Sequence, residues 1–200
     1  LNNTSGTGFQ LTGNHVGGRD SLCVGDALTL GVSGTLRSLV YYPLYLNVGS
    51  GVVSTFQQNV VRNLSLRSSN TAPFYGIRVD NGLVDVSNNA IGDTLGTGSI
   101  LLTGTVANTI SYGMYLDGNT TGQVSGNRIG AITTANTSSS NAHDVYALYT
   151  NSSGSTLSLT GNYIGSETTA SSIQASGTAT GNSQRVFGIY VAGTGTYQIN

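Results

Sequence analysis

The sequence predicts an all-β protein folded as a right-handed parallel β-helix, a solenoid of about five coils of roughly 35 residues with variable loops. Three observations predict it: a composition of strand and turn formers, two landmarks that alternate along the chain, and unequal loops between them. We expect residues 1–200 to form one β-helix segment. Because the pattern is already under way at both ends, we interpret the chain as a fragment of a longer repetitive protein.

The composition argues against a helical protein. Gly occurs 29 times among 200 residues, Lys is absent, and only 8% of the residues are charged, against about 25% in an average domain. Thr, Val, Ile and Tyr favour strands, whereas Gly and Asn favour tight turns. The chain therefore reads as many short strands joined by sharp bends.

The first landmark is an aromatic residue that opens a short alternating strand. By alternation, the apolar residue in the middle of each copy points inward and the next residue points outward. The aromatic that precedes Gly or its substitute is expected to point inward or to lie at a corner, where it stacks. The copies are YYPLYL (41–46), FYGIRV (74–79), SYGMYL (111–116), VYALYT (145–150) and VFGIYV (186–191).

The outward residues of these strands form a candidate binding surface. An exposed column of Tyr on a flat sheet could stack on sugar rings or on a partner surface. Arg78 holds the equivalent place in the second copy. The expected ligand-facing aromatics are Tyr45, Tyr115, Tyr149 and Tyr190.

The second landmark is an asparagine bend followed two residues later by Ile or Val. Asn tolerates the left-handed backbone of a sharp corner, and a preceding Gly removes the Cβ clash. Stacked Asn side chains can hydrogen-bond to each other and to the backbone. The predicted structural column is Asn14, Asn59, Asn89, Asn127 and Asn162.

The order of the landmarks is constant while the spacing varies. Each coil is expected to hold three short strands and one loop that absorbs the differences in length. Stacked coils lie about 4.8 Å apart, so that like residues lie above like residues. A leucine-rich repeat would need a regular Leu ladder, and a propeller would need more evenly spaced hairpins.

The repeat GNYIGSETTASSIQASGTATGNSQRVFGIYVAGTG and its shorter copies resemble the repeats of large secreted parallel β-helix surface proteins of Gram-negative bacteria. Those proteins have the pectate-lyase-like superfold, and many leave the cell by type nine secretion. The resemblance implies secretion and an adhesin-like or structural role. It also implies O-glycosylation at Asp-Ser/Thr-aliphatic triplets, which here point to Ser21 and Thr94.

Several partner and cofactor classes are not expected. A net charge of −1 with seven scattered Arg makes no basic stripe for nucleic acid. No apolar run reaches about 18 residues, so no membrane span is predicted. The Gly-x-Gly pieces precede no helix, and His15 and His143 lie in different phases of the repeat. We therefore predict no cofactor and no metal site.

The best catalytic constellation combines Asp80, Asp117 and Arg78. Both carboxylates follow the aromatic strand in consecutive coils, so stacking could place them about 5 Å apart. The ordinary interpretation is that they start Asp-Asn-Gly and Asp-Gly-Asn turns.

The leading hypothesis is a non-enzymatic extracellular or cell-surface segment with a structural or adhesin-like role. One alternative is a carbohydrate-binding or polysaccharide-degrading β-helix, and another is a self-assembling fibre subunit. The partners expected are accordingly glycans or neighbouring copies of the same protein.

Overall fold

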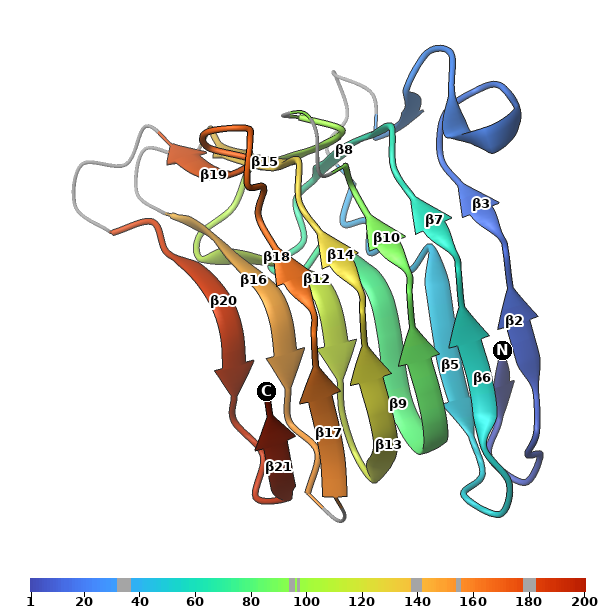
Figure 1. Cartoon of the computed structure of the whole chain (residues 1–200). Helices are drawn as coiled ribbons and strands as arrows, with labels where there is room; N and C mark the ends of the chain where they lie inside the picture. Colours follow the sequence, from blue (N-terminus) through green and yellow to red (C-terminus); the bar gives the residue numbers. More distant parts are fainter. Residues whose placement is uncertain (32–36, 94–95, 97, 138–141, 154–155, 178–182) are drawn as a thin grey trace.

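The computed structural model describes residues 1–31, 37–93, 96, 98–137, 142–153, 156–177 and 183–200, to which the structural statements below apply. The described chain is all-β, with mostly short strands and one 3-10 turn, η1 (Ser21–Cys23). Its paired strands are parallel and lie side by side in curled sheets (Figure 1). This part of the predicted fold class is confirmed, and the arrangement is consistent with a solenoid.

The chain passes through four strand positions in a fixed order. The largest sheet has two arms, called arm A and arm B, which are continuous through the long strand β9 (Phe74–Ser87). Two smaller sheets, called sheet C and sheet D, follow it along the chain. A strand pairs with the strand that occupies the same position one pass later, so that Tyr112 lies opposite both Tyr75 and Tyr146.

The strands of each position share one register. Arm A contains β1 (Asn2–Asn3), β5 (Leu44–Val48), the first half of β9, β12 (Thr109–Leu116), β16 (His143–Thr150) and β20 (Val186–Val191). Arm B contains β2 (Gln10–Thr12), β6 (Ser54–Gln57), the second half of β9, β13 (Thr120–Ser125), β17 (Thr156–Thr160) and β21 (Thr196–Ile199). Sheet C contains β3 (His15–Val16), β7 (Val60–Val61), β10 (Ala90–Ile91), β14 (Arg128–Ile129) and β18 (Tyr163–Ile164). Sheet D contains β4 (Leu28–Leu30), β8 (Leu64–Ser68), β11 (Ile100–Gly104), β15 (Ile132–Asn136) and β19 (Ile173–Gly177).

Sheet D corrects the expectation of three strands in each coil. The sequence analysis assigns this part of the repeat to the variable loop, but it forms a fourth strand in each complete pass. In β15, Ile132 and Thr134 are buried while Thr133 lies between them on the outer side. The Thr-rich composition concealed the alternation, because Thr is common in loops as well as in strands.

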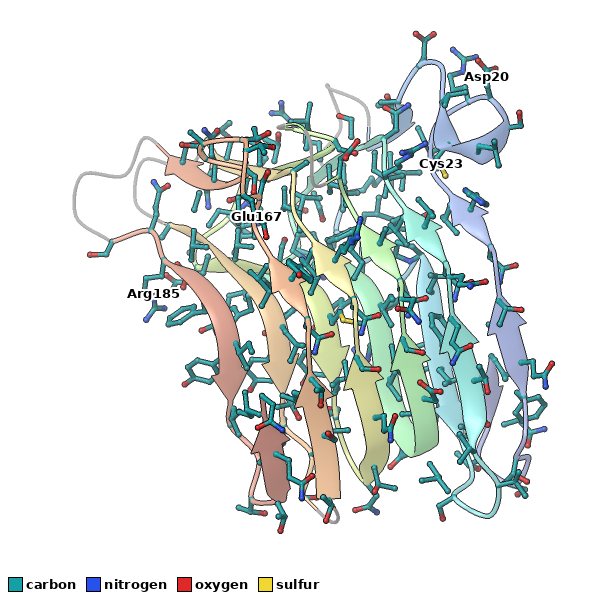
Figure 2. All side chains as sticks on the ribbon, viewed as in Figure 1. Asp20, Cys23, Glu167 and Arg185 are labelled. Carbon is teal, nitrogen blue, oxygen red and sulfur yellow. The ribbon has the colours of Figure 1, made fainter. Side chains whose placement is uncertain are left out.

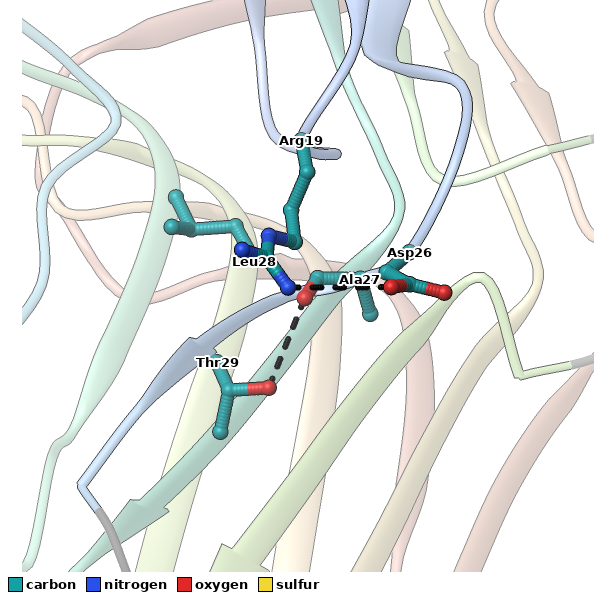
Figure 3. A pocket seen from close by; sticks show the side chains of 5 residues that line it. All are labelled: Arg19, Asp26, Ala27, Leu28 and Thr29. Atoms are coloured by element: carbon teal, nitrogen blue, oxygen red, sulfur yellow. Dashed lines mark hydrogen bonds and ion pairs between the residues drawn. The ribbon is translucent and has the colours of Figure 1, made fainter.

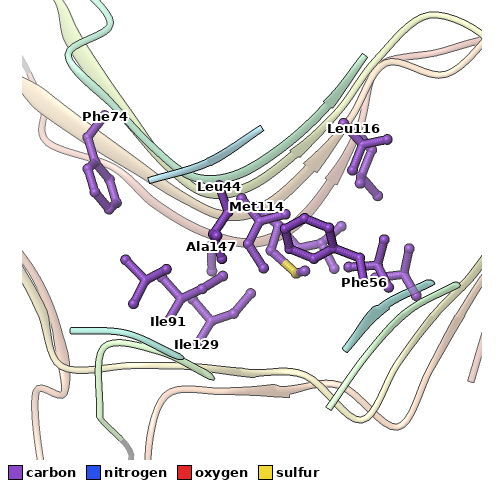
Figure 4. Packing of buried hydrophobic residues seen from close by; sticks show 14 of the residues in the cluster. Leu44, Phe56, Phe74, Ile91, Met114, Leu116, Ile129 and Ala147 are labelled. Carbon is purple, nitrogen blue, oxygen red and sulfur yellow. The ribbon is translucent and has the colours of Figure 1, made fainter. Parts of the chain in front are cut away.

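The hydrophobic core lies between the arms and the smaller sheets (Figure 4). Ile77 and Met114 of the aromatic strands are fully buried, as the alternation predicts, and they pack near Ile91 and Ile129 of sheet C. In β20 the equivalent Ile189 is 40% exposed, because β20 is the last strand of arm A and is covered on one side only. Burial of the core therefore depends on stacking between passes.

Arm A bends sharply at one residue position. In β9 both Gly76 and Ile77 are buried, which interrupts the alternation, and the ladder registers skip the equivalent glycines. Figure 4 shows arm A curving toward the core at Leu44, Met114 and Ala147, so its outer side is concave. A Cβ at Gly113 would lie 2.5 Å from the Ala147 carbonyl oxygen and 2.7 Å from Ile129 Cγ2. Close packing thus favours Gly at residue 113, although Ala147 holds the same position one pass later.

We expect Gly113→Ala to lower the free energy of unfolding by about 1–3 kcal/mol, the usual cost of overpacking. Gly188→Ala is the matched control: Gly188 holds the same position in β20, where an added Cβ would meet nothing within 4 Å. Urea unfolding followed by circular dichroism measures both. Equal losses of stability in the two variants would contradict the close approach of Gly113 to the Ala147 carbonyl oxygen.

Candidate functional site

The most distinctive surface is a strip of aromatic rings on the outer face of arm A. It consists of two columns, and we call the whole surface the aromatic strip. The first column is Tyr42, Tyr75, Tyr112, Tyr146 and Phe187. The second column is Tyr45, Arg78, Tyr115, Tyr149 and Tyr190, which share one register.

The first column lies outside, which the alternation did not predict. The bend at Gly76 and its equivalents places Phe74 and Ile77 inside, so that Tyr75 and Arg78 are both left on the outer face. Residues three apart then converge over the concave side of arm A. Two placements were expected for these aromatics: inward, or stacked at a corner. The inward one was wrong, because two successive buried residues break the two-residue period, and the rings stack beside this bend.

The rings are packed as a ladder. Within the second column, the Tyr115 and Tyr149 rings are nearly parallel, with centroids 5.0 Å apart. Between the columns, the Tyr112 and Tyr115 rings meet edge to face, with centroids 4.9 Å apart. Offset-stacked and edge-to-face pairs are the favoured aromatic geometries. The faces of the interior rings are therefore largely occupied by other rings, and Tyr146 is only 8% exposed.

Arg78 takes the place of a tyrosine in the second column. Its guanidinium carbon lies 5.0 Å from the Tyr75 ring centroid and 5.2 Å from that of Tyr115, within cation–π range. Its Nε donates to Asp80 Oδ1 at 2.6 Å. Burial acts to lower the pKa of Arg78, but the hydrogen bond and the charge of Asp80 outweigh it and the pKa rises.

The two carboxylates singled out by sequence are engaged by protein groups. Asp80 Oδ2 accepts a hydrogen bond from the Tyr45 hydroxyl at 2.7 Å. Asp117 accepts from the Tyr115 hydroxyl at 3.2 Å and from Asn151 Nδ2 at 3.0 Å. They lie in successive passes, since the Asp117 amide donates to the Val79 carbonyl. Both therefore complete the polar edge of the aromatic strip.

Burial changes the acidity of the phenols in the strip. It is the largest cause raising the pKa of Tyr112 and Tyr115, and nearby tyrosines and Asp117 add to it. Burial also raises the pKa of Tyr149. These phenols hence stay protonated at neutral pH and can donate hydrogen bonds.

The asparagine column forms a continuous hydrogen-bonded ladder. Both the amide nitrogen and Nδ2 of Asn59 donate to Asn89 Oδ1, and Asn89 donates in the same way to Asn127. The second Nδ2 hydrogen of Asn89 goes to the Phe56 carbonyl of the preceding pass. Asn14 and Asn162 continue the ladder at its two ends.

The left-handed residue of the bend differs from the one expected. Positive φ angles occur immediately before the ladder asparagines, at residues such as Asn88 (φ 56°) and Gly126 (φ 62°), while the ladder asparagines themselves lack one. The preceding residue therefore makes the corner, and the ladder Asn supplies the side-chain amide.

Sequence reasoning missed a buried histidine. His143 and Ser111 occupy adjacent strands and are almost completely buried, with Nε2 and Oγ 2.9 Å apart. Nδ1 lies 3.1 Å from the Ala135 carbonyl oxygen, which can only accept, so Nδ1 carries the proton. Burial lowers the pKa of His143, although the Ala135 hydrogen bond and Asp144 oppose that shift. Its position just before an aromatic strand was the available signal.

The last candidates are the two predicted glycosylation residues and an exposed ion pair near β4. Ser21 is exposed in η1, beside Asp20 and Cys23 in the loop after β3, far along the molecule from Arg185 (Figure 2). Thr94 lies outside the described residues. A hollow of about 490 Å³ near β4 holds an Arg19–Asp26 pair at 3.7 Å (Figure 3), but these side chains are 70% and 85% exposed.

Within the described residues, no group of three or more His, Cys, Asp or Glu side chains could hold a metal ion. No helix in that part of the chain is long and apolar enough to cross a membrane. No family model, curated protein or solved structure was found to match the chain.

We expect Asn89→Ala to destabilise the protein by about 3 kcal/mol or more, because it removes the acceptor of two buried Asn59 hydrogen bonds and the side-chain donor to the Phe56 carbonyl. Asn14→Ala is the control, since Asn14 is exposed and ends the ladder. It should cost under about 1 kcal/mol by the same reasoning. Urea unfolding measures both, and similar losses would refute a cooperative ladder.

We expect acid to destabilise the fold through His143. Its folded pKa lies below the ordinary value of 6.5, so the unfolded chain binds the proton more readily. Neutral His143 contributes fully to the free energy of unfolding above about pH 6.5, and this contribution is lost as the pH falls through the folded pKa. His143→Asn should reduce this pH dependence of the unfolding free energy. An unchanged pH dependence of the unfolding free energy in His143→Asn would exclude His143 as its source.

Proposed function

We propose that the chain is a non-enzymatic structural segment, a right-handed parallel β-helix, of an extracellular or cell-surface protein. The observation that carries the proposal is the asparagine ladder, whose hydrogen bonds link every successive pass from Asn14 to Asn162. Such a ladder ties each coil to the next and suits a stiff rod. Right-handedness follows the strong preference of parallel crossovers.

The composition supports the location. Few charges, no Lys and many Ser, Thr and Asn residues suit a surface that displays polar loops, as in the secreted proteins that the repeats resemble. The role would be mechanical, with an adhesin-like contribution from the aromatic strip.

Carbohydrate binding is the second candidate. The observation in its favour is the row of stacked, partly exposed tyrosine rings along the outer face of arm A. Sugars commonly bind through hydroxyl hydrogen bonds and through aromatic faces. Because the faces of the interior rings are already stacked on each other, edges and hydroxyls would have to do most of the binding.

Asp80→Asn separates the two candidates. If the strip is structural, losing the charge that binds Arg78 and Tyr45 lowers the unfolding free energy by about 1–2 kcal/mol and changes no glycan signal. Asp26→Asn is the control, because its ion pair with Arg19 is exposed.

The measurements are urea unfolding, a glycan array and release of reducing ends from a panel of polysaccharides. Array binding or sugar release by the unmodified chain that disappears in Asp80→Asn, with unfolding unchanged, would overturn the structural proposal in favour of a carbohydrate site.

A further inference from the structure

Two tyrosines of the aromatic strip face each other across neighbouring strands. Tyr115 of β12 and Tyr149 of β16 are register partners. Their ring centroids lie 5.0 Å apart, and the ring planes differ by only 5°. Tyr190 of β20 continues the stack at 5.5 Å and 6°. Fixed strand pairing therefore holds phenol rings in contact between passes that are distant in sequence.

The surroundings of this pair suit removal of an electron and a proton. The Tyr115 hydroxyl donates to Asp117 Oδ2 at 3.2 Å, so a carboxylate is in place to accept a proton. Both rings are only half-buried on the outer face, where a small oxidant can reach them. The rings nearest to them are also tyrosines, Tyr112 and Tyr146, which meet Tyr149 edge to face.

We infer that Tyr115 and Tyr149 form a site of oxidative cross-linking, at which a peroxide oxidant joins two passes of the chain through a dityrosine bond. Each phenol loses one electron and its hydroxyl proton, and hydrogen peroxide is reduced to two molecules of water. The two phenoxyl radicals form one carbon–carbon bond between ring positions ortho to the oxygens. The two hydrogens at those carbons then move to the oxygens and restore both phenols.

Proximity is the physical reason for this selectivity. Groups held in contact react with an effective concentration far above that of free solutes. Coupling between tyrosines within the aromatic strip should therefore be faster than coupling between separate molecules. The new bond would close a loop from β12 to β16, which restricts the unfolded chain and raises stability. The inference concerns ring chemistry and holds whether the strip is structural or binds sugars.

The test uses the full chain, hydrogen peroxide and a haem peroxidase, followed by trypsin and tandem mass spectrometry. With no Lys present, cleavage after Arg78, Arg128 and Arg185 puts Tyr115 in the peptide 79–128 and Tyr149 in the peptide 129–185. We expect a cross-linked pair of these two peptides with fragment ions that place the bond at Tyr115 and Tyr149. Monomeric product should show dityrosine fluorescence and a raised urea midpoint.

Tyr149→Phe keeps the ring and removes the hydroxyl, so it should retain the fold and lose this bond. Tyr163→Phe is the matched control, because Tyr163 is 55% exposed in sheet C and lies outside the strip. It should leave the yield unchanged. The inference is overturned if coupling occurs only between molecules, if Tyr163 couples as readily as the strip, or if urea-unfolded chain gives the same Tyr115–Tyr149 yield.

Discussion

The structure depends on one constraint: each strand pairs in parallel with the strand that holds the same position one pass later. At an interstrand spacing of about 4.8 Å, a side chain then has its own counterpart as its nearest neighbour. Residues that can bind their own kind are favoured at every column. Aliphatic side chains pack on their counterparts in the core, and phenol rings stack on theirs along arm A. Carboxamides hydrogen-bond to their counterparts at the asparagine bend. Like charges repel in such a column, and only 8% of the residues are charged.

Asparagine meets this constraint better than other polar residues. It carries both a donor and an acceptor on a short side chain, so one Asn can accept from the preceding pass while donating to the next. In Asn89 the oxygen accepts two hydrogen bonds, and the nitrogen serves both the next Asn and a backbone carbonyl. An aspartate would repel its neighbours and would offer no donor. The buried amides are thereby satisfied without water.

Much of the fold and of the aromatic strip could be predicted from the sequence, because alignment of the repeated copies shows which positions are equivalent. The inward Ile77 and Met114 and the shared register of Tyr115 and Tyr149 follow from period two and from alignment of the copies. Two of the features that sequence analysis missed have a clear physical reason. The bend at Gly76 leaves Tyr75 on the outer face, and it depends on a close approach between passes that no sequence pattern displays. Sheet D carries Thr at outward and inward positions alike, so its alternation is nearly invisible.

Breaks in the repetition are where individual chemistry can arise. A column of identical residues is built to satisfy itself, and it leaves few groups free to act on another molecule. Arg78 interrupts the tyrosine column and binds Asp80, and His143 lies inside a pass whose neighbour offers Ser111. Each exception is bonded within the protein, so each adds stability or pH dependence to its own coil. An activity in such a fold would need an exception with an unsatisfied partner on the outer face. The stacked phenols are a different case, because their reactivity comes from the repetition itself.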